Sequence, residues 1–179
     1  MSSNTEISEE IKRKLESIQA EMDSSFEVYL RKEFDLKLEF QKENKKLLNE
    51  RDEIIRSLTP EQFKNIISTA IDNLPELHSM LPIITVDNVE CYDTEFIKFI
   101  KTEYLEGYKI KITVELYEND YVENTLLERT ICFTTKEDSL CQVKYKEGVE
   151  PIPFFSFFTS DEDLLEMSDL LCECYYNLK

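Results

Sequence analysis

Apart from its carboxylates, this sequence has few side chains suited to acid–base or metal chemistry. His78 is its one histidine and lies near a proline turn, where a structural or solvent-facing role is more usual than general-base catalysis. Cys172 and Cys174 stand two residues apart, but no second cysteine pair completes a four-ligand zinc site. Two glycines cannot build a phosphate-binding loop. We therefore expect a protein that is not an enzyme and that uses no metal or cofactor.

Carboxylates, in contrast, are abundant. The chain has 38 acidic and 21 basic residues, a net charge of −17. Residues 87–179 alone hold 21 acidic and 9 basic side chains, a net charge of −12. Such a field repels nucleic acid and anionic lipid and attracts basic partners. Solubility alone is the alternative explanation of the charge.

The acids of the C-terminal half fall into three clusters, and we predict that they bind a basic partner. The clusters are Glu115, Glu118, Asp120 and Glu123 at the end of a predicted strand and in the loop after it, Glu137 and Asp138 in the next loop, and Asp161, Glu162, Asp163 and Glu166 at the start of the last helix. A solvated loop is the alternative for the first cluster. Favourable interaction with a helix N-terminus is the alternative for the third.

The elements that position these acids begin with a long helix. Residues 1–59 contain neither glycine nor proline and are rich in Glu, Lys, Leu and Arg, which favour helices. Their apolar residues recur every three or four positions, which predicts a helix over residues 7–56 about 75 Å long. Ser24 and Glu27 fit a capping box, so a break near residue 24 is possible.

A helix of this length cannot bury its apolar stripe alone, and the rest of the chain is too short to cover all of it. We therefore predict a homodimer in which the same helix of a second copy covers the stripe. The predicted interface residues are Met22, Phe26, Tyr29, Leu30, Phe34, Leu38, Phe40 and Leu47. An intramolecular helical hairpin is the alternative.

The remaining residues, 59–179, are predicted to form an α+β domain, with residues 1–58 as the dimerisation helix. A second helix begins at Thr59, because Thr59, Pro60 and Gln62 fit an N-terminal capping box. Alternating apolar residues predict strands over 108–116 and 127–133, with a short third strand at Val143 and Tyr145. Residues 96–104 fit a strand or a helical turn, and residues 154–159 and 162–177 fit helices. The short connections favour a small antiparallel sheet packed on helices.

Two further features bear on packing and location. We expect the phenylalanines at 154, 155, 157 and 158 to lie in the core, since contiguous exposed aromatics are rare, although a docking patch is the alternative. Five cysteines and a polar, acidic N-terminus favour a reducing compartment, which means the nucleus or cytoplasm. No apolar run approaches the roughly 20 residues of a membrane-spanning helix.

Five segments, in order along the chain, resemble motifs of the nucleosome-assembly-protein/SET family. They are Arg51 to Ile55; Pro60 and Phe63 with Asn73, Leu74 and Pro75; Gly107, Tyr108, Ile110, Ile112 and Val114; Asn119 to Leu126; and Pro153 to Phe158. Together they extend over about two thirds of the chain. Each motif alone is weak, but the five in the correct order are specific.

The resemblance implies a histone chaperone. Members of that family pair their long helices antiparallel, and each protomer carries an α+β "earmuff" domain. The two domains frame an acidic concave surface that shields core histones from DNA and promotes nucleosome assembly. This chain has no Trp, no long hairpin with a basic import signal and no acidic tail after Lys179, so the resemblance implies a minimal form. The alternative function is an acidic dimeric coiled-coil adaptor or a prefoldin-like holdase.

Overall fold

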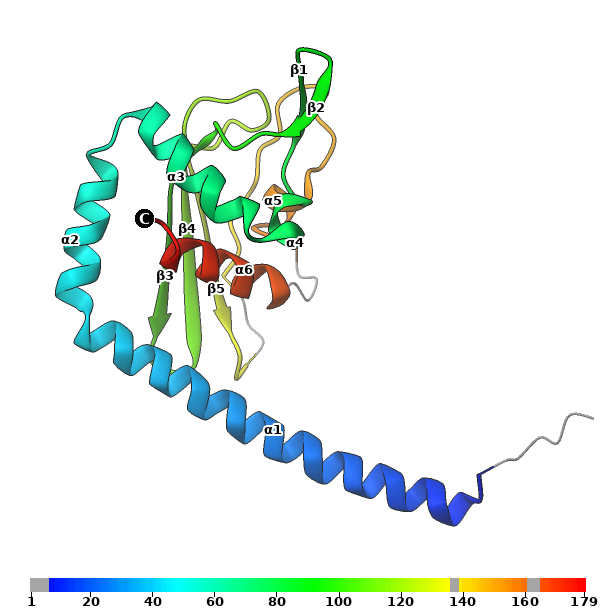
Figure 1. Ribbon diagram of the computed structural model, residues 1–179. Helices are drawn as coiled ribbons and strands as arrows, with labels where there is room; N and C mark the ends of the chain where they lie inside the picture. Colours follow the sequence, from blue (N-terminus) through cyan, green and yellow to red (C-terminus); the bar gives the residue numbers. More distant parts are fainter. Residues whose placement is uncertain (1–6, 136–138, 161–164) are drawn as a thin grey trace, which may run out of the picture.

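The computed structural model describes residues 7–135, 139–160 and 165–179. Helix α1, Glu9–Glu43, projects from the body of the molecule (Figure 1). The Ser8 side chain caps it by accepting a hydrogen bond from the backbone N–H of Ile11 at 3.4 Å. The helix runs unbroken through Ser24, so the predicted break near residue 24 is wrong. Serine inside a helix costs only tenths of a kcal/mol, on the order of 0.5, which the flanking helix formers offset.

The chain instead changes direction at Asn44, where α2, Lys45–Arg56, begins. The Asn44 side-chain amide donates to the carbonyl oxygen of Phe40 at 2.9 Å, a local bond that competes with regular helix geometry. Figure 1 shows α2 turning away from α1 and running alongside the sheet. The expected single helix over 7–56 is therefore two helices with a bend between them.

Helix α3, Pro60–Asp72, begins where the sequence predicts. The Thr59 side chain accepts from the backbone N–H of Gln62, and the Gln62 side chain accepts from the backbone N–H of Thr59, which completes the capping box. A short helix, α4, Pro75–His78, follows. Buried apolar residues of α3, including Phe63, Ile67 and Ile71, face the core.

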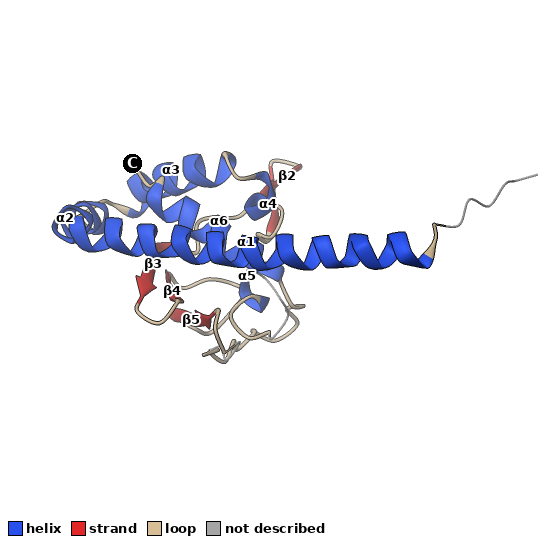
Figure 2. Ribbon diagram, turned by 90° about the horizontal axis from the view of Figure 1, so that it is seen from below, coloured by secondary structure: helices blue, strands red, loops and turns tan. Residues whose placement is uncertain are grey.

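The main sheet has three antiparallel strands in the order β3–β4–β5: Ile97–Leu105, Lys109–Leu116 and Leu126–Cys132. The strands predicted over 108–116 and 127–133 are confirmed, and the ambiguous segment 96–104 is a strand. Gly107 and Tyr108, both with positive φ, form the β3–β4 turn. Helices α3 and α6, Leu165–Tyr176, lie on one face of this sheet (Figures 1 and 2). The α+β class is confirmed.

One strand prediction is wrong, and one hairpin was not predicted. No strand forms at Val143 and Tyr145 in the described segments, where Tyr145 makes only an isolated bridge to Val122. Prolines and polar residues nearby leave no alternating run long enough for a ladder. Conversely, the residues directly after Pro82 form a hairpin of β1, Ile83–Val86, and β2, Val89–Tyr92. The sequence signal was a β-branched run interrupted by two turn-forming residues.

One core joins these elements. The four phenylalanines around α5, Pro153–Ser156, are fully buried, which confirms the core interpretation. Phe34 and Leu38 of α1 and Ile55 of α2 belong to the same core. Phe34 contacts the rings of Tyr104, Tyr108 and Phe133 at centroid distances of 4.9–6.1 Å. The C-terminal part of the long helix is therefore packed into the domain.

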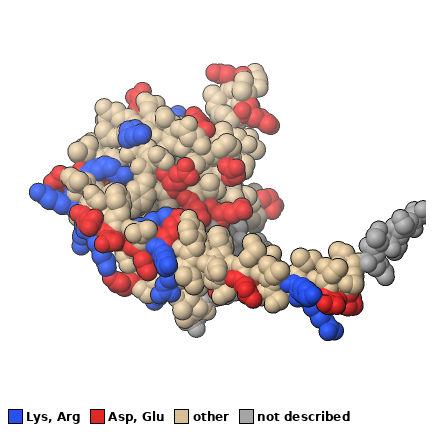
Figure 3. All heavy atoms as spheres, turned by 60° about the horizontal axis from the view of Figure 1, so that its bottom comes forward, with Lys and Arg blue, Asp and Glu red and all other residues tan. Residues whose placement is uncertain are grey.

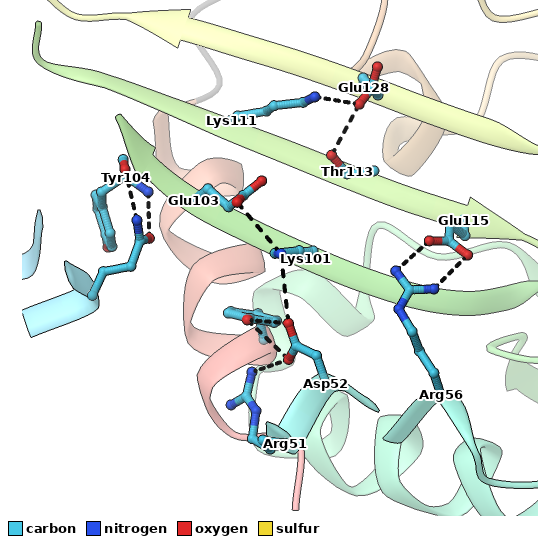
Figure 4. A network of polar contacts seen from close by, with 12 residues as sticks. Arg51, Asp52, Arg56, Lys101, Glu103, Tyr104, Lys111, Thr113, Glu115 and Glu128 are labelled. Carbon is cyan, nitrogen blue, oxygen red and sulfur yellow. Dashed lines mark hydrogen bonds and ion pairs between the residues drawn. The ribbon is translucent and has the colours of Figure 1, made fainter. Parts of the chain in front are cut away.

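A buried polar contact ties α2 to the C-terminal helix. The Tyr175 hydroxyl donates to the Asp52 carboxylate, 2.9 and 3.1 Å from its two oxygens. Arg51 bonds the same carboxylate at 3.1 Å, and Lys101 lies 3.9 Å from it (Figure 4). Because both Asp52 and Tyr175 are buried, the hydroxyl replaces hydration that the carboxylate loses on folding.

We therefore predict that Tyr175→Phe destabilises the protein by about 1.5–3 kcal/mol, since the buried carboxylate loses a donor. Urea unfolding followed by circular dichroism measures this difference. Tyr117→Phe is the matched control, because Tyr117 is half-exposed and its hydroxyl makes no hydrogen bond among the described residues. Equal stability of Tyr175→Phe and the control would show that the bond contributes nothing.

Candidate functional site

The loop after β4 presents the first predicted acidic cluster. The Asn119 side chain organises this loop, because its carbonyl oxygen accepts from the backbone N–H groups of Tyr121 and Val122 at 2.9 and 3.0 Å. Its amide also donates to the carbonyl oxygen of Tyr117 at 2.9 Å. Residues 117–122 are thereby held in a turn, and the acids beside Asn119 point away from the core.

A second segment holds the same loop in place. Glu123 donates its backbone N–H to the Lys144 carbonyl at 2.8 Å, and Lys146 donates its backbone N–H to the Tyr121 carbonyl at 2.9 Å. Asn124 adds two side-chain hydrogen bonds to this segment. Its amide donates to the Gln142 carbonyl, and its side-chain oxygen accepts from the backbone N–H of Lys144. The loop is therefore a fixed surface rather than a free connection.

Glu118, Asp120 and Glu123 are exposed on this loop. Within the described residues none of the three forms an ion pair with Lys or Arg. Their charge is thus available to a partner. The sequence prediction of an accessible acidic loop agrees with this geometry, although binding itself stays a prediction.

Two further acids lie beside the loop and were missed in the sequence. The Tyr121 hydroxyl donates to Asp93 at 2.7 Å. Burial raises the pKa of Tyr121, and so do the bond to Asp93 and the charges of Asp93, Asp120 and Glu95. Asp93 therefore contacts the hydroxyl directly, and Asp120 and Glu95 add negative charge near it. We call Glu118, Asp120, Glu123, Asp93 and Glu95 the acidic platform. In the sequence, Asp93 and Glu95 could have been found only by their position directly before the segment 96–104, which fits a strand.

Glu115 does not belong to the platform. Its carboxylate receives two hydrogen bonds from the Arg56 guanidinium, at 2.6 and 3.0 Å (Figure 4). The hydrogen bond from Arg56 lowers the pKa of Glu115, and the guanidinium also lies 3.9 Å from the Phe99 ring centroid. The prediction that Glu115 binds a partner is therefore corrected: its charge is used inside the protomer to join α2 to β4.

The remaining predicted acids fall into two groups: five lie outside the described residues, and Glu166 lies on α6. Glu137, Asp138, Asp161, Glu162 and Asp163 lie outside the described residues. Glu166 is exposed on α6, and Asp169 and Glu173 continue an acidic stripe on that helix which the sequence reading did not include. Asp169 lies near Lys37 and Glu33 of α1, since the three side chains line one surface pocket, and burial raises the pKa of Asp169.

Two ends of the sheet therefore carry two separate acidic regions. The platform follows the C-terminal end of β4, whereas α1 packs at its other end through Tyr108. An eight-residue strand spans roughly 25 Å. Among the described residues, the platform and Asp169 of α6 therefore lie toward opposite ends of the sheet. Figure 3 shows the face of the molecule near α1, where acidic side chains gather above the helix.

The predicted dimer-interface residues also fall into two groups, two that are buried and six that are exposed. Phe34 and Leu38 are buried by the chain's own sheet, so they are removed from the predicted interface. Their neighbours Tyr104, Tyr108 and Phe133 are far from α1 in the sequence, so the local pattern of α1 could not predict this packing. The other six are exposed by 37–63% of their surface: Met22, Phe26, Tyr29, Leu30, Phe40 and Leu47.

Within residues 7–135, 139–160 and 165–179, no cluster of three or more potential ligands is placed to hold a metal ion. Burial raises the pKa of the Cys172 thiol to about 11 and that of Cys174 to about 12, so both stay protonated at neutral pH. None of the helices in these ranges has the length and apolar character to cross a bilayer.

Fold and site together define an α+β protein with a long projecting helix and an exposed acidic surface. No family model matches the sequence. A protein of Encephalitozoon cuniculi, described as uncharacterized, is 30% identical over 165 residues, which are 92% of this chain and 88% of that protein. The chain belongs to the same family as this microsporidian protein.

Solved structures with similar folds are nucleosome assembly proteins of malaria parasites. One, described as the nucleosome assembly protein of the malaria parasite, is 17% identical, with 97% of this chain and 90% of that chain covered and a TM-score of 0.49. The nucleosome assembly protein S of Plasmodium falciparum is 17% identical over 89% and 90% of the two chains, with a TM-score of 0.47. Nucleosome Assembly Protein 1 of Plasmodium knowlesi is 16% identical over 97% and 91%, with a TM-score of 0.46.

The pairing of Glu115 generates a prediction. Glu115→Gln should destabilise the protein at pH 7 by about 0.5–1.5 kcal/mol, because a partly exposed bidentate pair is lost. Since the pKa of Glu115 is lowered on folding, the pair stabilises the protein above about pH 4.3 and its contribution disappears as the pH falls below the folded value. Thermal unfolding at pH 7 and pH 3 measures the difference.

Glu118→Gln is the matched control, because Glu118 is exposed and unpaired among the described residues. It should change stability by no more than about 0.5 kcal/mol at either pH. A larger loss from Glu118→Gln than from Glu115→Gln would contradict the assignment of the two roles.

Proposed function

We propose that this protein is a histone chaperone that binds basic core histones through its acidic platform and promotes nucleosome assembly and disassembly without catalysing a reaction. The observation that carries the proposal is the loop part of the platform: Glu118, Asp120 and Glu123 are exposed carboxylates held on a fixed loop in a chain of net charge −17. The five sequence motifs shared with nucleosome assembly proteins support it. The odd number of cysteines supports action in the nucleus or cytoplasm.

The mechanism follows from electrostatics. Carboxylates on the platform compete with DNA phosphates for histone Lys and Arg. A histone held this way makes fewer stray contacts with DNA, while the wrapped nucleosome, which has many more phosphate contacts, still forms. A fixed loop strengthens the interaction because less conformational entropy is lost when the partner binds. Direct binding to nucleic acid is disfavoured by the same charge.

The first test of function compares two sets of charge changes. Changing Glu118, Asp120 and Glu123 to the corresponding amides should weaken binding to a histone pair at 150 mM salt at least a few-fold. Changing Glu9, Glu10 and Glu16 to Gln is the matched control, because these acids lie on the exposed N-terminal part of α1. Fluorescence anisotropy with each labelled histone pair measures both.

Both triple variants raise the net charge by the same amount. A general attraction by the whole negative field would therefore lower affinity equally in the two variants. Equal losses, or a larger loss from the N-terminal set, would place the binding site away from the platform.

We also propose that the protein is a homodimer through α1. At 100° per residue, the exposed residues Met22, Tyr29 and Leu36 lie roughly 140–180° around the helix from the midpoint of Phe34 and Leu38. One face of α1 is thus covered by its own chain, and an apolar stripe remains uncovered opposite it. A long stripe of this kind on a stable helix calls for a partner.

The stripe also suggests how two copies pair. It is nearly symmetric about Ser24, so an antiparallel pair centred there would bring apolar residues together. The facing residues would be Met22 with Phe26, Ile18 with Tyr29, Ile11 with Leu36, and Ile7 with Phe40. A parallel pair would also match apolar residues, but each with its own counterpart. The two arrangements therefore differ in the distances between equivalent residues.

Spin labels measure this difference directly. In a background with Cys91 and Cys141 changed to Ser, a label at Ser25→Cys, which 100° per residue places on the apolar stripe, should lie about 10 Å from its equivalent, the usual distance between packed helices. A label at Lys12→Cys should lie roughly 35 Å from its equivalent, because each copy is displaced by twelve residues at 1.5 Å. Close pairs at both positions would indicate a parallel dimer. No dipolar coupling at either position would indicate a monomer.

A further inference from the structure

The β1–β2 hairpin projects from the end of the molecule remote from α1 (Figure 1). Its two strands pair with each other through Ile83–Tyr92 to Val86–Val89, and Asp87 and Asn88 make the turn with φ values of 51° and 63°. No third strand pairs with either edge in the described part of the chain. Both edges therefore present unpaired backbone groups.

The two faces of the hairpin differ in chemistry. Residues opposite each other in an antiparallel pair share a face. The register therefore puts four apolar residues on one face: Ile84, Val86, Val89 and Cys91. Val86 is 51% exposed and Val89 64% exposed, so this face has no cover near the turn.

The opposite face is mixed. It holds Ile83, Thr85, Glu90 and Tyr92. Tyr92 packs against the core, and its ring centroid lies 4.0 Å from that of His78, so this face is anchored at its base. Toward the turn, Thr85 and Glu90 are polar and exposed. A segment pairing with this hairpin would therefore meet apolar side chains on one side and a carboxylate on the other.

The surroundings of the hairpin are acidic. Asp87 lies in the turn, and Asp93 and Glu95 of the acidic platform follow β2 directly. Lys64 pairs with Glu95, and His78 lies 3.8 Å from Asp72. The hairpin thus combines open strand edges, an uncovered aliphatic face and negative charge. Proteins normally block such edges, because open edges invite pairing with other chains.

We propose that the hairpin binds an extended basic segment as a third β-strand, with aliphatic residues and Lys or Arg at alternate positions. The aliphatic residues would cover Val86 and Val89, and the basic residues would face Glu90 and Asp87, because side chains of a strand alternate between its faces. The inference rests on the proposed histone function, in that the same basic partner supplies the segment, and it names an extended part of that partner.

The test uses the full chain and two labelled peptides of identical composition. In one peptide Val and Lys alternate, and in the other the same residues are grouped so that alternation is lost. The test variant is Val86→Thr with Val89→Thr, which removes the aliphatic face but keeps β-branched residues that favour strands. Val28→Thr is the matched control, because Val28 is 54% exposed on α1.

We expect the alternating peptide to bind the wild type and the control equally and the double variant about tenfold more weakly. The grouped peptide should bind about tenfold more weakly to all three. Hydrogen exchange should show protection of residues 83–92 when the alternating peptide binds. Equal binding of the two peptides, equal binding to the double variant, or protection confined to 117–125 would overturn the inference.

The same measurements separate this inference from the proposed function. If histone pairs bind the platform but the alternating peptide does not bind the hairpin, the hairpin inference fails alone. If the alternating peptide binds the hairpin and histones do not bind the protein, the strand-binding surface stands and the histone function fails.

Discussion

The structure depends on a constraint on α1: this helix has two apolar faces, and its own chain can cover only one. Phe34 and Leu38 fill the sheet end of the core. Next to them, the Gln41 side-chain amide binds the backbone of Tyr104 at both its N–H and its carbonyl, at 2.8 and 2.9 Å. That pair of bonds occupies the free edge of β3 as a neighbouring strand would. The helix is thereby fixed to the sheet, and its other face is left to associate.

Fixing α1 also determines which charges remain available. The bend at Asn44 directs α2 along the sheet, where Asp52 and Arg56 find partners in Tyr175 and Glu115. The charged side chains of Asp52 and Arg56 therefore stabilise the fold. The loop acids Glu118, Asp120 and Glu123 lie at the far end of the strands and form no ion pair with Lys or Arg among the described residues, whereas Glu95 pairs with Lys64. The molecule thus separates apolar association at one end from electrostatic binding at the other, and neither function has to compromise the other.

Local patterns in the sequence predicted most elements, because short-range physics determines them. The alternation of Ile110, Ile112 and Val114 defined β4, and the Thr59 capping box defined the start of α3. Contacts distant in sequence could not be predicted. The two apolar faces of α1 look alike in sequence, and only the contacts with Tyr104, Tyr108 and Phe133 determine which face is buried. The role of Glu115 depended in the same way on Arg56, 59 residues earlier.

The central claim is that affinity for histones comes from carboxylates rather than from an apolar interface. The most direct measurement is the dissociation constant for a histone pair, and for an unrelated unfolded protein, between 50 and 300 mM salt. The account predicts tight histone binding that weakens steeply with salt, and weak binding of the unfolded protein throughout. Salt-independent binding, with the unfolded protein bound as tightly as the histones, would contradict it.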